Sequence, residues 1–105
     1  MADIHATAII DSSAKLADGV VVGPYAVIGP RVQIGAGSEI RSFANIYQDT
    51  ILGENNRVNS YVALGSDPQI RGYVWEEGSE LIIGAGNTFH EGVSISRGIA
   101  KFGGQ

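Results

Sequence analysis

The sequence predicts an all-β fold, a single-stranded parallel β-helix in which short strands wind into about five coils. The main observation is an aliphatic residue at every sixth position from Ile4 to Ile70, without exception. A period of six fits neither an α-helix nor a simple strand, whose side chains repeat every 3.6 and 2 residues. The second observation is a small residue or a valine two positions before most of these aliphatic residues. The third is a glycine directly after many of them.

Each six-residue repeat is expected to form one side of a three-sided prism. The aliphatic side chain and the small residue point into the prism, and the glycine adopts the backbone angles of the corner. Three repeats complete a coil, so like residues stack eighteen positions apart at the strand spacing of about 4.8 Å. One interior column is then Ile10, Ile28, Ile46 and Leu64.

Two other folds fit the pattern poorly. In an α-helix, six residues rotate a position by about 240°, which would scatter the aliphatic residues around the cylinder. The 15 glycines also disfavour helix. A β-sandwich would need two-residue alternation and turns every 8–12 residues or so.

Composition limits the partners of the chain. Its 105 residues carry a formal charge of −4, and its lysines and arginines form no cluster, which argues against nucleic acid or an anionic membrane surface. The absence of cysteine excludes disulfides and thiolate metal sites. No apolar stretch approaches the roughly 20 residues of a membrane span, and the first residues do not form a secretory signal. We therefore expect a cytoplasmic domain without membrane insertion.

The repeat divides the chain into four parts. Regular coils are expected over residues 1–70, a projecting loop over 71–80, a resumed coil over 81–96 and a tail over 97–105. The loop is polar, acidic and aromatic, and the repeat returns after it one residue out of phase, at Ile83. Insertions in repeat folds often form binding faces, so this loop is expected to carry function. The tail contains no capping helix, and the chain is expected to stop in the middle of a loop.

Few residues offer catalytic chemistry. His5 follows an interior position and is interpreted as a surface residue. His90 and Glu91 could form an acid–base couple, but neighbouring residues of a strand point to opposite faces. Two histidines cannot supply a three-histidine metal site within one subunit. We therefore assign no catalytic residue, cofactor or metal ligand, and interpret the loop glutamates as solvated charges: Glu76, Glu77 and Glu80.

Four aromatic residues fall between interior positions and are expected to point outward: Tyr25, Phe43, Tyr47 and Tyr61. A set of exposed aromatic rings on one prism suggests a subunit interface. Because six-residue-repeat prisms commonly form trimers, we expect a homotrimer.

Four segments resemble motifs of the acyl-[acyl-carrier-protein]–UDP-N-acetylglucosamine O-acyltransferases. Residues 4–10 (IHATAII) resemble the opening repeat of that family, hPTAiv, and residues 22–30 (VGPYAVIGP) resemble IGPfcvIGP. Residues 64–69 (LGSDPQ), followed by Tyr73, resemble the loop IGxxPQDlkY. Residues 93–98 (VSISRG) resemble VTIHRGT. The resemblance covers essentially the whole chain.

The resemblance implies a left-handed coil and a role in lipid A biosynthesis. Enzymes of this family transfer an acyl chain from acyl carrier protein to the 3-hydroxyl of the sugar of UDP-N-acetylglucosamine. A histidine removes the hydroxyl proton, and backbone N–H groups stabilise the oxyanion. The substrate-binding residues implied for this chain are Gln69, Tyr73 and Arg97.

Three positions depart from the family motifs. Ile70 replaces an aspartate that helps to hold the glucosamine, Gly72 replaces a lysine, and Ser96 replaces a histidine. The general-base histidine of the family belongs to later coils, beyond residue 105, so the chain is expected to be incomplete and inactive alone. Two alternatives stay open: a non-catalytic trimeric scaffold, and an acyltransferase for another nucleotide sugar.

Overall fold

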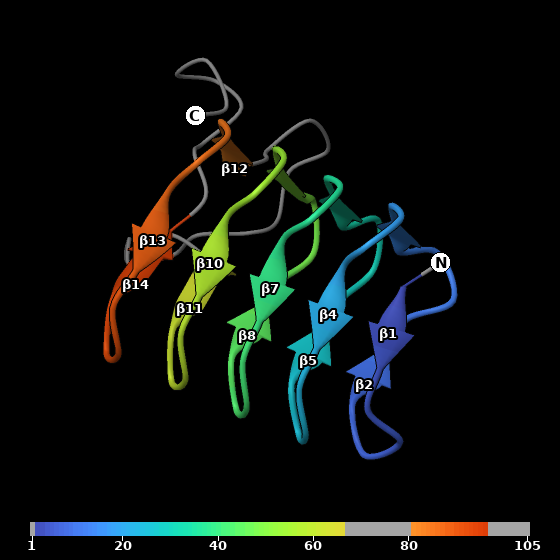
Figure 1. Ribbon diagram of the computed structural model, residues 1–105. Helices are drawn as coiled ribbons and strands as arrows, with labels where there is room; N and C mark the ends of the chain where they lie inside the picture. The colour runs from blue at the N-terminus through green and yellow to red at the C-terminus, as the bar shows by residue number, and fades with distance from the viewer. Residues whose placement is uncertain (1, 67–80, 97–105) are drawn as a thin grey trace.

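Short strands wind around a three-sided prism (Figure 1). The computed structural model describes residues 2–66 and 81–96, and these residues form fourteen strands. Successive strands along the chain lie on successive sides of the prism, so each sheet contains every third strand. The predicted parallel β-helix is confirmed.

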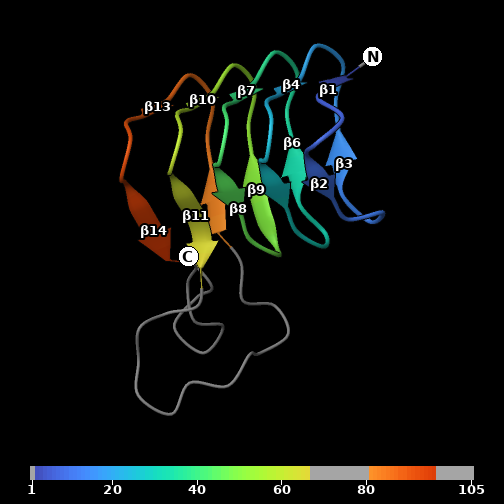
Figure 2. The same ribbon diagram turned by 90° about the horizontal axis from the view of Figure 1, so that it is seen from below.

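The first sheet contains β1 (Asp3–Ile4), β4 (Val21–Val22), β7 (Glu39–Ile40), β10 (Arg57–Val58) and β13 (Thr88–Phe89). The second contains β2 (Ile9–Ile10), β5 (Val27–Ile28), β8 (Asn45–Ile46), β11 (Ala63–Ser66) and β14 (Ser94–Ser96). The third, which Figure 2 shows from below, contains β3 (Lys15–Leu16), β6 (Gln33–Ile34), β9 (Thr50–Leu52) and β12 (Leu81–Ile83). All strand pairs are parallel.

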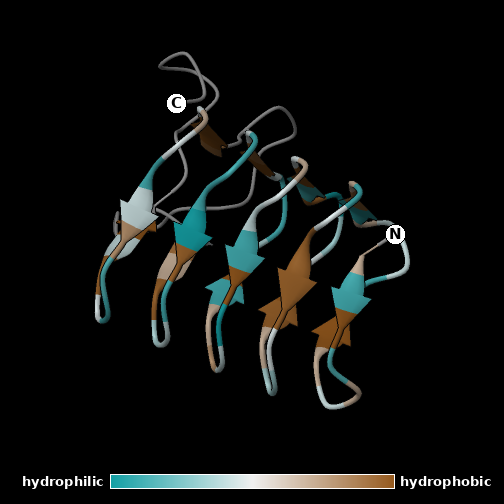
Figure 3. Cartoon of the chain, viewed as in Figure 1, coloured by the Kyte–Doolittle hydropathy of each residue, from teal (hydrophilic) through white to brown (hydrophobic). Residues whose placement is uncertain are grey.

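The strand register follows the six-residue repeat. In the second sheet Ile10 pairs with Ile28, Ile28 with Ile46, and Ile46 with Leu64. This is the column expected from the sequence. In several strands an outward polar residue precedes the aliphatic one, so teal and brown alternate in Figure 3, whereas β2, β4 and β5 are apolar throughout.

Both expected interior sets are buried from Val20 to Leu64, whereas in the first coil Ile4 is exposed and Ile10 and Leu16 are only partly buried. The aliphatic residues from Val22 to Leu64 have at most 2 % of their surface exposed. The position two residues earlier is equally buried, and it holds Val20, Ala26, Val32, Ser38, Ala44, Thr50, Asn56 and Val62. The core is therefore a narrow rod of side chains, in which removing one large aliphatic side chain would cost about 2–5 kcal/mol.

The corners correct one expectation from the sequence. Apart from Gly65, the residues with positive φ lie three positions after an interior residue, and most of them carry side chains: Tyr25, Arg31, Phe43, Asp49, Asn55 and Tyr61. The glycine directly after the aliphatic residue serves another purpose. A Cβ on Gly35 would lie 2.5 Å from the carbonyl carbon of Gly53 in the next coil. Glycine at that position thus permits close stacking of the backbones rather than unusual corner angles.

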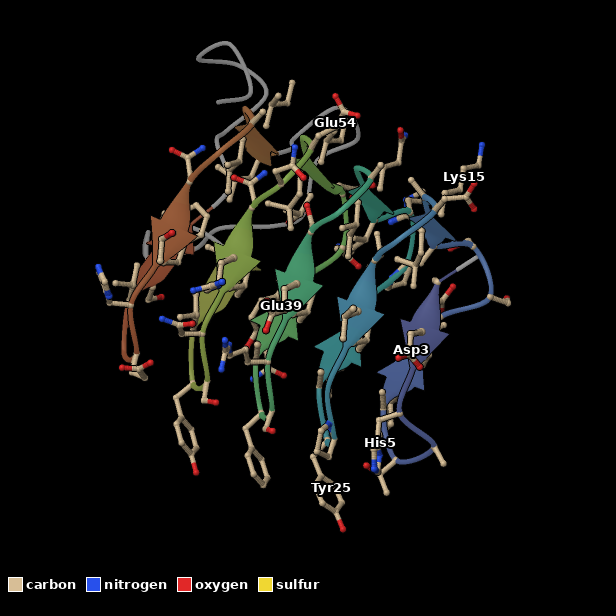
Figure 4. The ribbon with its side chains drawn as sticks, viewed as in Figure 1. Asp3, His5, Lys15, Tyr25, Glu39 and Glu54 are labelled. Atoms are coloured by element: carbon tan, nitrogen blue, oxygen red, sulfur yellow. The ribbon has the colours of Figure 1, made fainter. Side chains whose placement is uncertain are left out.

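One corner carries a column of stacked aromatic rings. The ring centroids of Tyr25 and Phe43 are 5.3 Å apart, and those of Phe43 and Tyr61 are 5.5 Å apart. The rings are exposed, as expected, and Tyr25 points away from the prism in Figure 4. Such stacking contributes about 0.5–1.5 kcal/mol per pair, which offsets the cost of about 1–2 kcal/mol for a left-handed backbone.

A polar column lies inside another corner. The Ser38 hydroxyl accepts a hydrogen bond from the Asn56 N–H at 3.1 Å. The Asn56 amide nitrogen donates to the carbonyl oxygens of Gly53 at 3.0 Å and Gly84 at 2.8 Å, and its oxygen accepts from the Asn87 N–H at 2.8 Å. Buried polar groups are thereby satisfied from coil to coil.

The third sheet continues past the insertion that separates β11 from β12 in the sequence. Ile83 of β12 pairs with Leu52 of β9, at the position that the six-residue count assigned to Ile70. Ile70, expected in the regular coils, and the expected loop over 71–80 lie outside the described residues, and the division of the chain into four parts stays a prediction. Within the described ranges no helix is long and apolar enough to cross a membrane.

Candidate functional site

The second sheet brings together the two places where predicted substrate residues join the prism. Strands β11 and β14 lie side by side, with Leu64 paired to Ile95 and Ser66 paired to Ser96. The described parts of both strands therefore end side by side, at Ser66 and Ser96. Gln69, Tyr73 and Arg97 themselves lie outside the described residues, so their assignment stays a prediction.

Strand β11 leaves the regular path of the coil at Gly65. This residue has a φ of +83°, and a bulge separates Leu64 from Ser66 in the pairing with β14. A Cβ on Gly65 would collide with the Thr50 hydroxyl and would lie 3.7 Å from the Tyr47 Cβ. Only glycine fits here, because the backbone angle and the space both exclude a side chain. Sequence reasoning missed this role and treated Gly65 as one more corner glycine.

Thr50 packs against Gly65, the exit at which the chain leaves the regular path of the coil. Its side chain is fully buried, and its hydroxyl is 3.5 Å from the Leu64 carbonyl oxygen, to which it donates. The equivalent position one coil earlier holds Val32, which has no hydroxyl. The sequence predicts Thr50 only as one of the small interior residues, and nothing in it indicates a hydrogen bond from its hydroxyl.

The returning chain is fixed to the same corner. Leu81 pairs with Thr50, and the Leu81 N–H donates to the Asp49 carbonyl oxygen at 3.2 Å. The Asp49 side chain accepts from the Arg31 guanidinium at 2.7 and 3.3 Å, and this ion pair raises the pKa of Arg31. The backbone N–H of Arg31 also donates a hydrogen bond to the Ser13 hydroxyl, at 2.9 Å. A polar column therefore supports the corner from outside.

A hollow of about 270 Å³ lies on the outer face of the second sheet beside this exit. Its lining is mostly apolar and consists of Val27, Gly29, Pro30, Asn45, Ile46, Tyr47 and Gln48. Tyr47, which is half-exposed, lines the hollow and also lies next to Gly65.

The two histidines lie elsewhere. His5 is exposed, and its Nδ1 accepts a hydrogen bond from the Thr7 N–H at 3.1 Å, which ties the ring to its own turn. His90 is exposed at the corner between β13 and β14. No side-chain hydrogen bond joins it to Glu91 within the described part of the chain. Those residues also contain no group of three or more His, Asp or Glu side chains that could hold a metal ion.

Comparison with known proteins identifies the family. No protein-family model matches the chain. The acyl-[acyl-carrier-protein]–UDP-N-acetylglucosamine O-acyltransferase of Syntrophobacter fumaroxidans is 47 % identical over 98 residues, which cover 93 % of this chain and 38 % of the relative. The enzyme of the same name from Xanthomonas euvesicatoria is 48 % identical over 101 residues, covering 96 % and 38 %. The chain is similar to the N-terminal part of the UDP-N-acetylglucosamine O-acyltransferases.

Solved structures agree with this identification. The UDP-N-acetylglucosamine O-acyltransferase of Moraxella catarrhalis superposes with a TM-score of 0.89 at 39 % identity, covering 93 % of this chain and 38 % of that one. The protein from Acinetobacter baumannii gives 0.91 at 39 % identity, covering 96 % and 39 %. These acyltransferases are left-handed β-helices, so the predicted left-handed sense is confirmed. The chain spans less than two-fifths of the length of the relatives that it matches.

Proposed function

We propose that this chain forms the sugar-nucleotide side of a UDP-N-acetylglucosamine O-acyltransferase. The observation that carries the proposal is the pairing of Ser66 with Ser96. Through it, the two segments that match the substrate loop and the Arg-Gly motif of the family start from one edge of the second sheet. In the proposed site Gln69 and Tyr73 contact the nucleotide sugar, and Arg97 supplies a positive charge for its phosphates.

The proposed reaction is acyl transfer from acyl carrier protein. The sugar 3-hydroxyl loses its proton to a histidine, its oxygen attacks the thioester carbonyl, and the thiol of the carrier leaves. His5 and His90 are both exposed on corners of the first sheet and do not lie beside the exit at Gly65. We therefore propose that these 105 residues contribute binding and do not contribute the general base.

We also propose that the active assembly is a homotrimer. The support is the exposed ring column, in which Tyr25 is 58 %, Phe43 is 45 % and Tyr61 is 67 % exposed. Burying such rings between subunits would stabilise association by about 25 cal/mol per Å² of apolar surface. A cytoplasmic location is part of the same proposal, because acyl carrier protein is a soluble partner.

Calorimetric titration of the chain with UDP-N-acetylglucosamine tests the proposal. The expected result is saturable binding that is weakened by Gln69→Ala and by Arg97→Ala, and not by Gln33→Ala on the third sheet. Acyl transfer is expected to be absent when acyl carrier protein bearing an acyl chain is added. Binding of a different nucleotide sugar in preference would favour the alternative substrate, and no binding of any nucleotide sugar would favour a scaffold.

A further inference from the structure

We propose that Asn56 determines which repeat of the chain rejoins the β-helix after the insertion, and on which side of the prism it does so. Three repeats follow the insertion in the described chain, and each stacks its aliphatic residue on one of the coil before: Ile83 on Leu52, Phe89 on Val58 and Ile95 on Leu64. A slip of one whole repeat would move all three to the next side of the prism.

Burial of aliphatic side chains does not by itself prevent such a slip. Leu52, Val58 and Leu64 are alike in being aliphatic and almost fully buried, with at most 2 % of their surface exposed. From Ile4 to Leu64 the short turns exclude a slip, because successive aliphatic residues are always six positions apart. Nineteen positions separate Leu64 from Ile83, and the entropy of closing a connection changes little when six residues are added or removed. Another interaction must therefore choose the side.

The turn that follows β12 is held open by side chains. In a closed turn the last N–H donates to the carbonyl three residues earlier. In the turn over residues 84–87, the Asn87 N–H instead donates to Oδ1 of Asn56 at 2.8 Å. The Gly84 carbonyl accepts from Nδ2 of Asn87 at 3.2 Å and from Nδ2 of Asn56 at 2.8 Å. Asn56, which is only 1 % exposed, therefore binds both ends of this turn.

The same arrangement occurs one coil earlier. In the turn over residues 53–56, the Asn56 N–H donates to the Ser38 hydroxyl at 3.1 Å. The Gly53 carbonyl accepts from Nδ2 of Asn56 and from the Ser38 hydroxyl, both at 3.0 Å. Both open turns have the sequence Gly-x-x-Asn, and both lie against a buried polar residue of the coil before. An asparagine at the end of the turn and a polar residue in the preceding coil thus act together.

Two other turns of the prism are closed. The N–H of Ser38 and that of Val93 each donate to the carbonyl three residues earlier, at 3.4 and 3.2 Å. The residues at the same position in the coil before are the apolar Val20 and Val62. Neither of these turns ends in asparagine. Open and closed turns are therefore distinguished by their last residue and by the interior residue of the preceding coil.

A slip of one repeat would separate Asn56 from the open turn. In one direction Val93 would lie next to Asn56, and the Val93 N–H is already bound within its own turn. In the other direction Asn87 would lie next to Val62, which offers no acceptor to the Asn87 N–H. Either slip leaves a polar group in or beside the core without a partner, and such groups are costly. A single buried asparagine fixes the register of coiled coils in the same way.

Cysteine cross-links report the register in the full chain, which contains no cysteine of its own. Residues paired across neighbouring parallel strands lie about 4.8 Å apart, within the range of a disulfide. The pair Ile51→Cys and Ile82→Cys reports the observed register, in which these outward residues are partners. The pair Ile51→Cys and Thr88→Cys reports a chain that has slipped by one repeat. Each cross-linked fraction is measured by mass spectrometry at equilibrium with glutathione.

The wild-type chain should form the cross-link between positions 51 and 82 and very little of the one between 51 and 88. Replacing both asparagines, by Asn56→Val and Asn87→Val, should increase the second cross-link about tenfold or more, because no unpaired polar group then opposes the slip. This variant should stay folded, since the turn can close on itself, as the turn next to Val20 does. Circular dichroism checks its strand content.

Thr50→Val is the matched control, because it removes a buried hydroxyl from the third sheet. It should leave both cross-links at the wild-type level. Moving the asparagine is the converse test: Asn87→Val combined with Val93→Asn keeps the composition and should increase the cross-link between 51 and 88 at the expense of the one between 51 and 82.

Three results would overturn the inference. The first is a folded double-valine variant with no more slipped cross-link than the wild type. The second is an equal increase in Thr50→Val, and the third is an unchanged register after the asparagine is moved. Loss of strand content in the double-valine variant would count against it as well, because a closed turn is expected to replace the open one.

Discussion

Ile83 pairs with Leu52 although thirty-one residues separate them in the chain, whereas Leu52 and its other partner, Ile34, are separated by eighteen. The segment between these two strands is therefore thirteen residues longer than in the regular coil before it. The prism therefore tolerates a long insertion at one corner while the column of buried aliphatic residues passes through it unbroken. This is the expected thermodynamic behaviour of a loop insertion, since the entropy of loop closure grows only slowly with length.

Deleting residues 68–80 should leave the fold intact. The deletion joins Gly65-Ser66-Asp67 to Leu81-Ile82-Ile83, which is a complete six-residue repeat with Leu81 and Ile83 at interior positions. Circular dichroism should show the same strand content and a cooperative thermal transition. Deleting residues 69–80 removes one residue fewer and shifts the register, so that variant should be clearly less stable. Equal stability of the two deletions would contradict the pairing of Ile83 with Leu52.

Phe43→Ala should destabilise the protein by about 1–3 kcal/mol, because it removes two ring contacts and leaves a side chain at a left-handed position. Phe43 has a φ of +61°. Phe43→Gly loses the same contacts but relieves the backbone, so it should be more stable than Phe43→Ala by about 1 kcal/mol. Urea denaturation of both variants measures the difference. The reverse order of stability would show that the backbone strain at this corner is small.

Gly35→Ala should be strongly destabilising, by about 2 kcal/mol or more, because two backbone segments would have to separate. The new Cβ would lie 2.5 Å from the Gly53 carbonyl carbon and 2.7 Å from the Glu54 nitrogen. Gly84→Ala is the matched control, since it occupies the same corner position with no described atom within 4 Å. Thermal denaturation should separate the two variants by several degrees. A neutral Gly35→Ala would mean that the coils can move apart without cost.

Asn56→Ala should cost about 2–4 kcal/mol, since the Asn56 side chain is buried and its removal breaks three hydrogen bonds. The Asn87 N–H loses its acceptor, whereas the Gly84 carbonyl keeps the Asn87 amide as a donor at 3.2 Å. Asn87→Ala provides the comparison, because Asn87 is exposed and its amide donates at 3.2 and 3.4 Å. Its expected cost is below about 1 kcal/mol. Chemical denaturation that gives equal losses for both variants would argue against a buried polar column.

The interior of the protein was predictable residue by residue. The period of six, together with the rule that one side of each repeat must face a core, predicts that Ile28, Ile46 and Leu64 form one column, as they do. The outward aromatic residues followed from the same count. The resemblance to the family could also be seen in the sequence, because the motifs around Gln69 and Arg97 are short continuous segments of the chain.

The corners and the exit depended on the tertiary structure. The sequence alone does not show whether a glycine is needed for a positive φ or for close packing of two backbone segments. Gly65 has a positive φ, whereas Gly35 does not and instead lies against the backbone of Gly53. The residues that decide the difference, Gly53 and Thr50, lie in neighbouring coils and contact these glycines only after the chain has wound once around.

The sequence by itself determined the kind of fold, its core and its family, because these depend on a repeat that every coil obeys. Only the tertiary structure decided which glycine permits the backbones of neighbouring coils to pack closely and which residue packs against Gly65. It also decided that β11 and β14 end side by side. The physical reason is that hydrophobic periodicity is a property of single strands, whereas steric contact and strand register depend on residues one coil apart.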